Sequence, residues 1–421
     1  MKVRMTHPPT APSDRFWRSV GVVLTGSAMA QAIPLLGSLA IARIYAPGEF
    51  GLFASWLGVT SLLAVVITGR FEMALALEPD GEPRRVAVIA VLVTVAAASG
   101  GVLCLLTLSW LAGWARLPHT ALWFLGALTA ALMATAQTWQ AWAAANGNYR
   151  RLSTIRIAQA TLVTGSQILA GLYDPSAPTL AFAHAAGVAG GIAIAMWQLP
   201  LSLRQPSGPG WRHALRDFCA RHRRLPMVSL PADSINTAAG QLPLLIVTTR
   251  FGAEVAGWLA LTMRMLGGPI SLLGAAVLDV FRRHAAQSWR EHGQCRGDYM
   301  RAFKVLGGAS ALFVLALAPA SEALFQLAFG APWRMAGTIA FWLLPMFAFR
   351  FVASPLSYMF YVADKQHIDL LWQSTLLCMT LASLLLPASY SAALQIYSLG
   401  YSGMYIIYLL LSYRFSLGPA R

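Results

Sequence analysis

About twelve apolar stretches of roughly 18 to 26 residues each lie between Ser19 and Leu411, and they constrain the fold more than any other feature. A helix of that length crosses the hydrocarbon core of a bilayer, which is about 30 Å thick. A helix also satisfies its own backbone hydrogen bonds, as a lipid environment requires. We therefore predict an all-α polytopic membrane protein with about 12 transmembrane helices. The predicted spans are 19–42, 50–69, 86–108, 119–142, 157–173, 179–199, 226–249, 255–281, 305–327, 335–360, 369–386 and 392–412.

The basic residues lie almost entirely on one side of these spans. When the chain is threaded with its N-terminus inside, 25 of its 31 lysines and arginines fall in inward segments, of which 201–225 and 282–304 are the longest. Cytoplasmic loops of membrane proteins carry this excess. The sequence thus predicts a multi-pass protein of a bacterial inner (cell) membrane with both termini in the cytoplasm. The exceptions are Arg43, Arg116, Arg250 and Arg334 in outward segments, and Arg264 and Arg350 within spans.

The composition fits a membrane protein and excludes a nucleic-acid-binding module. The chain is 57% hydrophobic and 11% charged, whereas a soluble domain is about 25% charged. Its net charge of +15 does not indicate nucleic acid, because the basic residues are divided among short loops. We expect membrane lipids, whose anionic headgroups attract such loops, and no nucleic acid among the partners.

The two halves of the chain resemble each other. The segment QAIPLL that begins at Gln31 recurs as QLPLL from Gln241, and corresponding residues lie between 206 and 218 positions apart, close to half of 421. An even number of spans in each half makes the halves parallel repeats, with a substrate site expected between them. We predict an N-terminal six-helix bundle over 1–200, a cytoplasmic linker with a short basic helix over 201–225, and a C-terminal six-helix bundle over 226–421. The corresponding pairs are Gln31 with Gln241, Arg43 with Arg250, Gly51 with Gly257 and, more weakly, Arg116 with Arg334.

The seventh predicted span carries the strongest polar stripe. Four polar residues follow one helical face at positions i, i+3, i+4 and i+8, and Pro231 and Pro243 flank them. Proline removes a backbone donor and bends a helix, so this span is a candidate gating element. Gln31 belongs to a sparser stripe in the first span. These polar residues either line a substrate cavity or hydrogen-bond to neighbouring helices. The stripe is Asp233, Asn236, Thr237 and Gln241.

Two arginines within spans are candidate substrate ligands. Arg264 lies roughly 13 Å into the eighth span, and an arginine at such a depth is costly unless it faces water, an acid or an anionic substrate. A structural pair with Asp233 or another acid is the alternative, and Arg350 in the tenth span is a second candidate. At the inner end of the second span, Arg70 and Glu72 form either a gate or a local ion pair.

Features of catalytic sites do not occur in the sequence. The eight histidines are scattered without metal-ligand spacing, there is no phosphate-binding loop, and no nucleophile accompanies a base in a recognisable arrangement. We therefore expect neither an enzyme nor a bound metal or cofactor.

Several loop motifs resemble those of polysaccharide-biosynthesis flippases, the Wzx-type members of the multidrug/oligosaccharidyl-lipid/polysaccharide exporter superfamily. The resemblance covers nearly the whole chain and implies two six-helix bundles in a V shape, alternating access and a polyprenyl-diphosphate-linked oligosaccharide as cargo. The lipid II flippase branch is less similar, because it has cavity-facing arginines in the first span, where this chain has none before Arg43. The motifs are Ala42 to Gly51 (ARIYAPGEFG), Thr68 to Glu72 (TGRFE), Gln241 to Pro269, Phe329 to Trp333 (FGAPW) and Ser354 to Leu356 (SPL).

These observations favour a flippase that moves an undecaprenyl-diphosphate-linked oligosaccharide to the periplasmic leaflet for a surface polysaccharide such as O-antigen, lipopolysaccharide or exopolysaccharide. A polymerase and glycosyltransferases of the same pathway would be its partners. Two alternatives stay open, an ion-coupled small-molecule exporter of the same superfamily and a membrane glycan polymerase.

Overall fold

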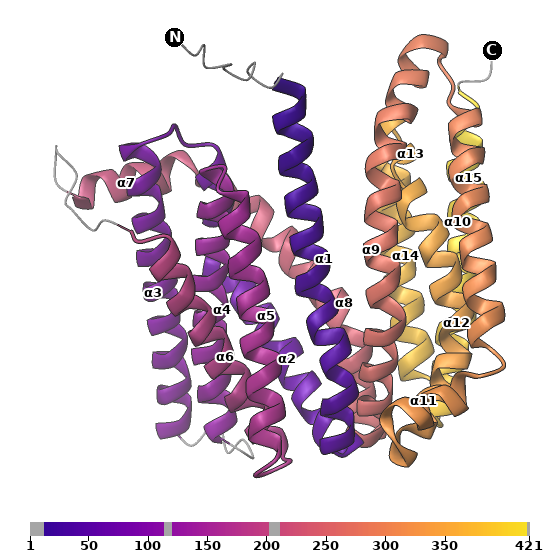
Figure 1. Cartoon of the computed structure of the whole chain (residues 1–421), viewed down its shortest axis with the longest axis horizontal. Coiled ribbons are helices and arrows are strands. Elements are labelled where there is room, and N and C mark those ends of the chain that lie inside the picture. Colours follow the sequence, from indigo (N-terminus) through magenta and orange to yellow (C-terminus); the bar gives the residue numbers. More distant parts are fainter. Residues whose placement is uncertain (1–11, 113–119, 202–210, 419–421) are drawn as a thin grey trace, which may run out of the picture. The chain divides into compact units, whose positions relative to one another are not determined.

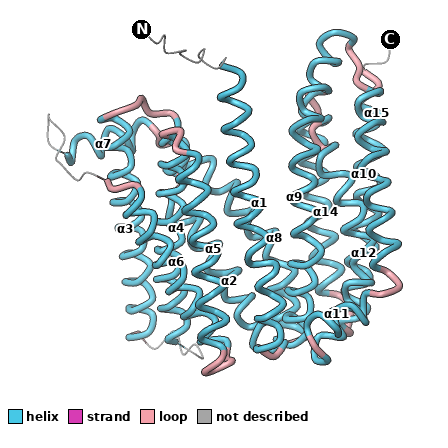
Figure 2. The backbone as a smooth tube through the Cα atoms, in the orientation of Figure 1, coloured by secondary structure: helices cyan, strands magenta, loops and turns pink. Residues whose placement is uncertain are grey.

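The computed structural model describes residues 12–112, 120–201 and 211–418, and every element within these ranges is a helix (Figure 1 and Figure 2). Nine helices in these ranges are long and apolar enough to cross a membrane. The all-α polytopic fold is therefore confirmed. The number of about 12 spans stays a prediction, because α5 (Tyr149–Gly171), α8 (Leu230–Phe251) and α9 (Ala253–His292) are not among the nine.

The helices alternate with short connections along the whole described chain. In the first half they are α1 (Pro12–Ile44), α2 (Pro47–Thr68), the 3-10 helix η1 (Phe71–Ala76), α3 (Glu82–Leu111), α4 (Thr120–Ala145), α6 (Ala177–Gln198) and α7 (Trp211–Arg221). In the second half they are the π-helical turn η2 (Leu225–Ser229), α10 (Arg296–Leu317), α11 (Ser321–Phe329), the 3-10 turn η3 (Ala331–Trp333), α12 (Arg334–Leu356), α13 (Met359–Val362), α14 (Gln366–Leu385) and α15 (Tyr390–Ser416).

Each predicted span overlaps a helix, and the helices differ from the predicted boundaries at two places. The long inward link predicted over 282–304 is filled by α9 and α10, which leave only three residues between them. Gly293 makes this tight turn with a positive φ of 67°. Hydropathy marks where a helix leaves the lipid, and these basic helices continue beyond that point.

The second difference concerns the predicted span 305–327. The structure breaks it after Leu317 and begins the separate helix α11 at Ser321. Pro319 lies in the break. Proline lacks the backbone N–H that would continue the helical hydrogen bonds, which accounts for the interruption.

The described chain divides into two compact units, which are treated separately below. Among the described residues, unit 1 comprises 12–37, 59–112, 120–170, 181–201 and 211–236, and unit 2 comprises 38–58, 171–180 and 237–418. Five helices, namely α1, α2, α5, α6 and α8, contribute residues to both units.

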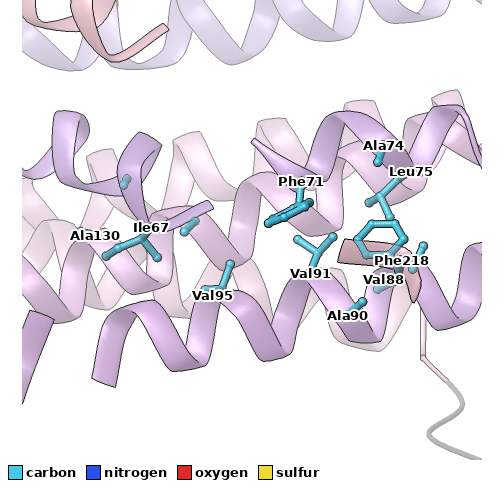
Figure 3. Packing of buried hydrophobic residues seen from close by; sticks show 13 residues of the cluster. Ile67, Phe71, Ala74, Leu75, Val88, Ala90, Val91, Val95, Ala130 and Phe218 are labelled. Atoms are coloured by element: carbon cyan, nitrogen blue, oxygen red, sulfur yellow. The ribbon is translucent and has the colours of Figure 1, made fainter. Parts of the chain in front are cut away.

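The core of unit 1 surrounds η1. Figure 3 shows Phe71 above Val91 of α3, with Phe218 of α7 grouped beside them. The rings of Phe71 and Phe218 are 5.8 Å apart, so the linker helix α7 is packed on the bundle by its apolar face. The polar side of this contact is buried Glu78, which pairs with Arg221 at 2.9 Å and His222 at 2.7 Å. The predicted short basic helix of the linker is thus confirmed, while residues 202–210 lie outside the described ranges.

In unit 2 the repeat-related glycines of α2 and α9 meet each other. A Cβ atom on Gly51 would overlap the carbonyl oxygen of Ala253, and one on Gly257 would overlap the carbonyl oxygen of Pro47. Pro47 and Ala253 are 206 positions apart, as are Gly51 and Gly257. The contact is therefore reciprocal, as at an isologous interface between two identical surfaces. This geometry supports the predicted repeat.

The repeat-related arginines of unit 2 also have matching roles. Arg43 donates to the carbonyl oxygens of Leu327 (2.9 Å) and Ala328 (3.0 Å) at the end of α11, and Arg250 donates to the carbonyl oxygens of Leu384 (3.2 Å) and Leu385 at the end of α14. The last carbonyls of a helix lack partners within it and carry the negative end of its dipole. Both arginines therefore cap helix C-termini. The weaker repeat pair involving Arg116 lies outside the described residues.

Candidate functional site

An ion-pair cluster in unit 1 joins three of the predicted site residues. The Arg70 guanidinium lies 2.6 Å from Asp233 on α8 and 3.1 Å from Glu72 on η1. The hydrogen bond to Asp233 raises the pKa of Arg70 above its usual value, so the arginine is a permanent cation. Asp233 is thus paired with Arg70.

The backbone at this cluster is unusual. Gly69 and Arg70 both have positive φ, 56° and 60°. This conformation is costly for a residue with a side chain, and strained positions concentrate at functional sites. Glu72 is 8% exposed, and its second carboxylate oxygen is buried without a hydrogen-bond partner among the described residues. Arg70 is therefore the ion-pair partner of the buried Glu72 carboxylate among the described residues.

The polar stripe of α8 continues beyond this cluster. Asp233 and Asn236 belong to unit 1, where Asn236 is exposed, while Thr237 and Gln241 belong to unit 2 and are half-buried. Gln241 packs against Gly58 of α2, where a Cβ atom would lie 2.9 Å from its amide oxygen. This stripe thus combines an accessible part with a part used in helix packing.

The two prolines of this helix differ in environment. Pro231 is exposed in the first turn of α8, directly after the π-helical turn η2, and Pro243 is buried within the helix. A π-helical turn beside a proline marks a departure from regular helix geometry. The bend expected of this span therefore has a structural basis at the N-terminal end of α8.

Unit 1 also contains a polar cluster that sequence reasoning missed. Arg156 on α5 donates to the amide oxygen of Gln140 on α4 at 3.1 Å and to the hydroxyl oxygen of Ser27 on α1 at 2.9 Å. Gln140 donates in turn to Gln159 at 3.0 Å. Arg156 was counted among the inward loop charges because it precedes the predicted span by one residue. Gln31, one turn further along α1 from Ser27, is exposed.

Unit 2 holds Arg264 and Arg350. Arg264 is half-buried on α9, while Arg350 is exposed on α12 and makes no hydrogen bond or ion pair with a described residue. Arg350 lies within electrostatic reach of Tyr397, Tyr401 and Tyr405 on α15. Their rings are 5.1 Å and 5.3 Å apart along the helix. The i, i+4, i+8 spacing of these tyrosines was visible in the sequence.

The described residues offer binding groups and no metal site. No cluster of three or more His, Cys, Asp or Glu side chains in the described ranges is arranged to hold a metal ion. The arginines, amides and tyrosines instead provide hydrogen-bond donors inside membrane helices. Such groups are suited to holding an anionic or polyhydroxylated ligand.

Solved structures with a similar fold are membrane transporters. Lipid II flippase MurJ in an inward closed conformation is 13% identical, with a TM-score of 0.68, and the match covers 93% of this chain and 87% of that chain. An inward-facing multidrug resistance MATE family transporter of the MOP superfamily is 15% identical, with a TM-score of 0.64, and covers 92% and 98%. The MATE multidrug transporter DinF-BH is 14% identical, with a TM-score of 0.56, and the match covers 98% of both chains.

These likenesses define the fold class, which is the fold shared by these transporters. A family model described as "Polysaccharide biosynthesis protein" matches residues 40–338. The chain therefore belongs to the polysaccharide biosynthesis protein family. No curated protein sequence matches it.

Proposed function

We propose that this protein is a flippase of the bacterial inner membrane that moves an undecaprenyl-diphosphate-linked oligosaccharide from the cytoplasmic to the periplasmic leaflet. Its alternating access would involve the two six-helix bundles over 1–200 and 226–421, joined by the linker 201–225, with both termini in the cytoplasm. Family membership combined with the MOP fold supports a transporter or flippase in polysaccharide biosynthesis. The identity of the cargo, a lipid-linked oligosaccharide, is what we propose beyond this.

The observation that carries the proposal is the presence of arginines within membrane helices of a polysaccharide biosynthesis protein. A guanidinium presents five donors in a planar fork that matches phosphate oxygens. We assign the cargo diphosphate to Arg264 and Arg350, and its sugars to Asp233, Asn236, Thr237, Gln241 and Gln31.

The ion-pair cluster has the features of a gate at the inner end. Arg70 bridges Glu72 and Asp233, and therefore ties η1 to the first turn of α8. Pro231 and Pro243 allow α8 to bend when this tie is released. Opening would separate Arg70 from Asp233 and leave Glu72 as the remaining partner of the arginine.

Deletion of the gene tests the proposal directly. Loss of surface polysaccharide, with lipid-linked oligosaccharide retained in the cytoplasmic leaflet, is the expected result. Unchanged surface glycan together with altered dye efflux would identify a small-molecule exporter. Normal export with altered chain length would identify a polymerase.

Arg264 provides the test at residue level. We expect Arg264→Ala to abolish glycan export while the protein still folds and inserts, because the diphosphate would lose a ligand. Arg264→Lys should restore only part of the activity, since a point charge lacks the bidentate fork. Full export by a well-expressed Arg264→Ala protein would contradict the assignment.

A further inference from the structure

Arg156 is a cation inside a helical bundle, and it has no counter-ion among the residues that the structure describes. No described carboxylate lies within ion-pair distance, and its hydrogen-bond partners are a neutral amide and a hydroxyl. The side chain is half-buried. A charge in a membrane helix that lacks an opposite charge is costly, and such charges mark functional sites.

Close helix packing fixes the position of this arginine. A Cβ atom on Gly26 would overlap Ser153, and one on Gly37 would overlap Thr164, so α1 and α5 approach each other closely along this length. The approach brings Ser27 to Arg156. Gln159 is also positioned by close packing against a glycine. A Cβ atom on Gly191 of α6 would lie 2.8 Å from the Cβ atom of Gln159, so only a glycine leaves room for it there.

The fixed partners leave part of the guanidinium available. Nε donates to Gln140 and Nη1 donates to Ser27, which uses two of the five N–H groups. Nη2 has no partner among the described residues and is not buried from solvent. The outer edge of Arg156 is therefore held in position with donors to spare, which is the state that binds an oxyanion without reorganisation.

The depth of the cluster matches an entry from the inner side. Arg156 is seven residues after the start of α5, which is about 10 Å along the helix. Exposed Gln31 lies one turn outward from Ser27 on α1 and adds amide groups on the same helix face.

We propose that Arg156, supported by Gln140, Gln159 and Ser27, is a binding site for a phosphate group, and that its ligand is the diphosphate of the lipid-linked cargo at the inner end of the path. The assignment of the cargo as ligand rests on the proposed function. The anion site itself rests on the geometry of unit 1. The headgroup of a bulk phospholipid also offers a phosphate group, and the experiment below distinguishes this ligand from the cargo.

The sharpest variant is Gln140→Glu, which places a carboxylate beside Arg156 with almost no change in shape. Gln159 can rotate its amide to donate to the new acid. If Arg156 is an anion site, the internal carboxylate competes with the ligand, so thermal stability rises while affinity for a diphosphate falls. If Arg156 is only a packing element, stability rises and affinity stays unchanged.

Binding is measured on the purified full-length protein in detergent with farnesyl diphosphate as the probe, and with farnesol and phosphatidylglycerol as comparators. We expect Arg156→Gln to weaken farnesyl diphosphate binding by about tenfold or more, as loss of a charged hydrogen bond implies. Arg156→Lys should lie between, and Gln140→Glu should weaken binding while raising the melting temperature. Farnesol binding should not change. Arg151→Gln, an exposed arginine on the same helix, is the matched control.

Equal binding of farnesyl diphosphate by the wild type, Gln140→Glu and Arg156→Lys would overturn the site, even if Arg156→Gln failed to fold. Displacement of the probe by phosphatidylglycerol at equal concentration would overturn the cargo as ligand. Glycan export is scored separately in a deletion strain. If the wild type exports glycan but the variants bind the probe equally well, the Arg156 site is rejected and the flippase function stands. If the variants bind the probe differently but no glycan export is found, the Arg156 site stands and the flippase function is rejected.

Discussion

Arg84 and Arg156 of unit 1 are each held by two or more fixed partners, whereas Arg350 of unit 2 is exposed beside tyrosines. Arg84 in unit 1 donates to the carbonyl oxygens of Leu75, Glu78 and Ala145 and is 7% exposed. Arg350 has no described hydrogen bond. The same residue type thus serves as a structural brace in one region and as an accessible charge in the other. Substitution of the bracing arginine should therefore impair folding, whereas substitution of Arg350 should impair transport.

The largest expected effect is that of Arg84→Ala. The substitution removes the donor from the carbonyl oxygens of Leu75 and Glu78 at the turn that positions η1 and from that of Ala145 at the end of α4, so we expect a loss of about 3–5 kcal/mol and little folded protein. Size-exclusion profiles and thermal melting of the detergent-solubilised protein measure this. Arg85→Ala is the control, because Arg85 is more exposed and its pair with Glu82 spans 3.7 Å. Equal losses for both variants would refute the role of Arg84 as a brace.

Loss of the Arg70 side chain should have an intermediate effect on stability, and loss of its two acidic partners should cost unequal amounts of stability. Arg70→Ala leaves the buried carboxylate of Glu72 unpaired, at a cost of about 1–3 kcal/mol. Asp233→Ala leaves Arg70 paired with Glu72, so its cost should be about 1 kcal/mol or less. Melting temperatures of the two variants compare them. The combination of Arg70→Ala with Glu72→Gln should recover stability, and failure to recover it would show that the charge of Glu72 is not the cause.

Arg350→Ala should leave folding nearly unchanged, within about 0.5 kcal/mol, because the side chain is exposed and makes no described hydrogen bond. Glycan export in a deletion strain should nevertheless fall. Arg350→Lys should retain part of the export. A strong loss of stability with Arg350→Ala would remove the contrast between the two units.

The smallest expected effect is a difference in chemical labelling along α8. In a cysteine-free background, Asn236→Cys should react with a small aqueous thiol reagent, because Asn236 is exposed. Val247→Cys should react much more slowly, since Val247 is fully buried. Equal rates at both positions would argue that the accessible part of the stripe is also a packing surface.

The sequence predicted the helices because apolar length and the placement of basic residues are local properties. It did not predict that Asp233 pairs with Arg70, since these residues are 163 positions apart and nothing local connects them. Arg156 was missed because a hydropathy window assigned it to a loop, while its partners on α1 and α4 are visible only in three dimensions. The tyrosine spacing on α15 was visible, but its proximity to Arg350 depends on the packing of α12 against α15.

The close approach of the helices at Gly51 and Gly257 imposes the same constraint on two positions that are distant in the sequence. Each glycine leaves space for the backbone of the other helix, so neither position has room for a methyl group. An enlargement at one position cannot be offset at the other, because both would add volume at the same place. A selection for active variants from a random library should therefore return glycine at both positions independently. Two separate stretches of the gene would then record one shared spatial constraint, as expected of a sequence that arose by duplication.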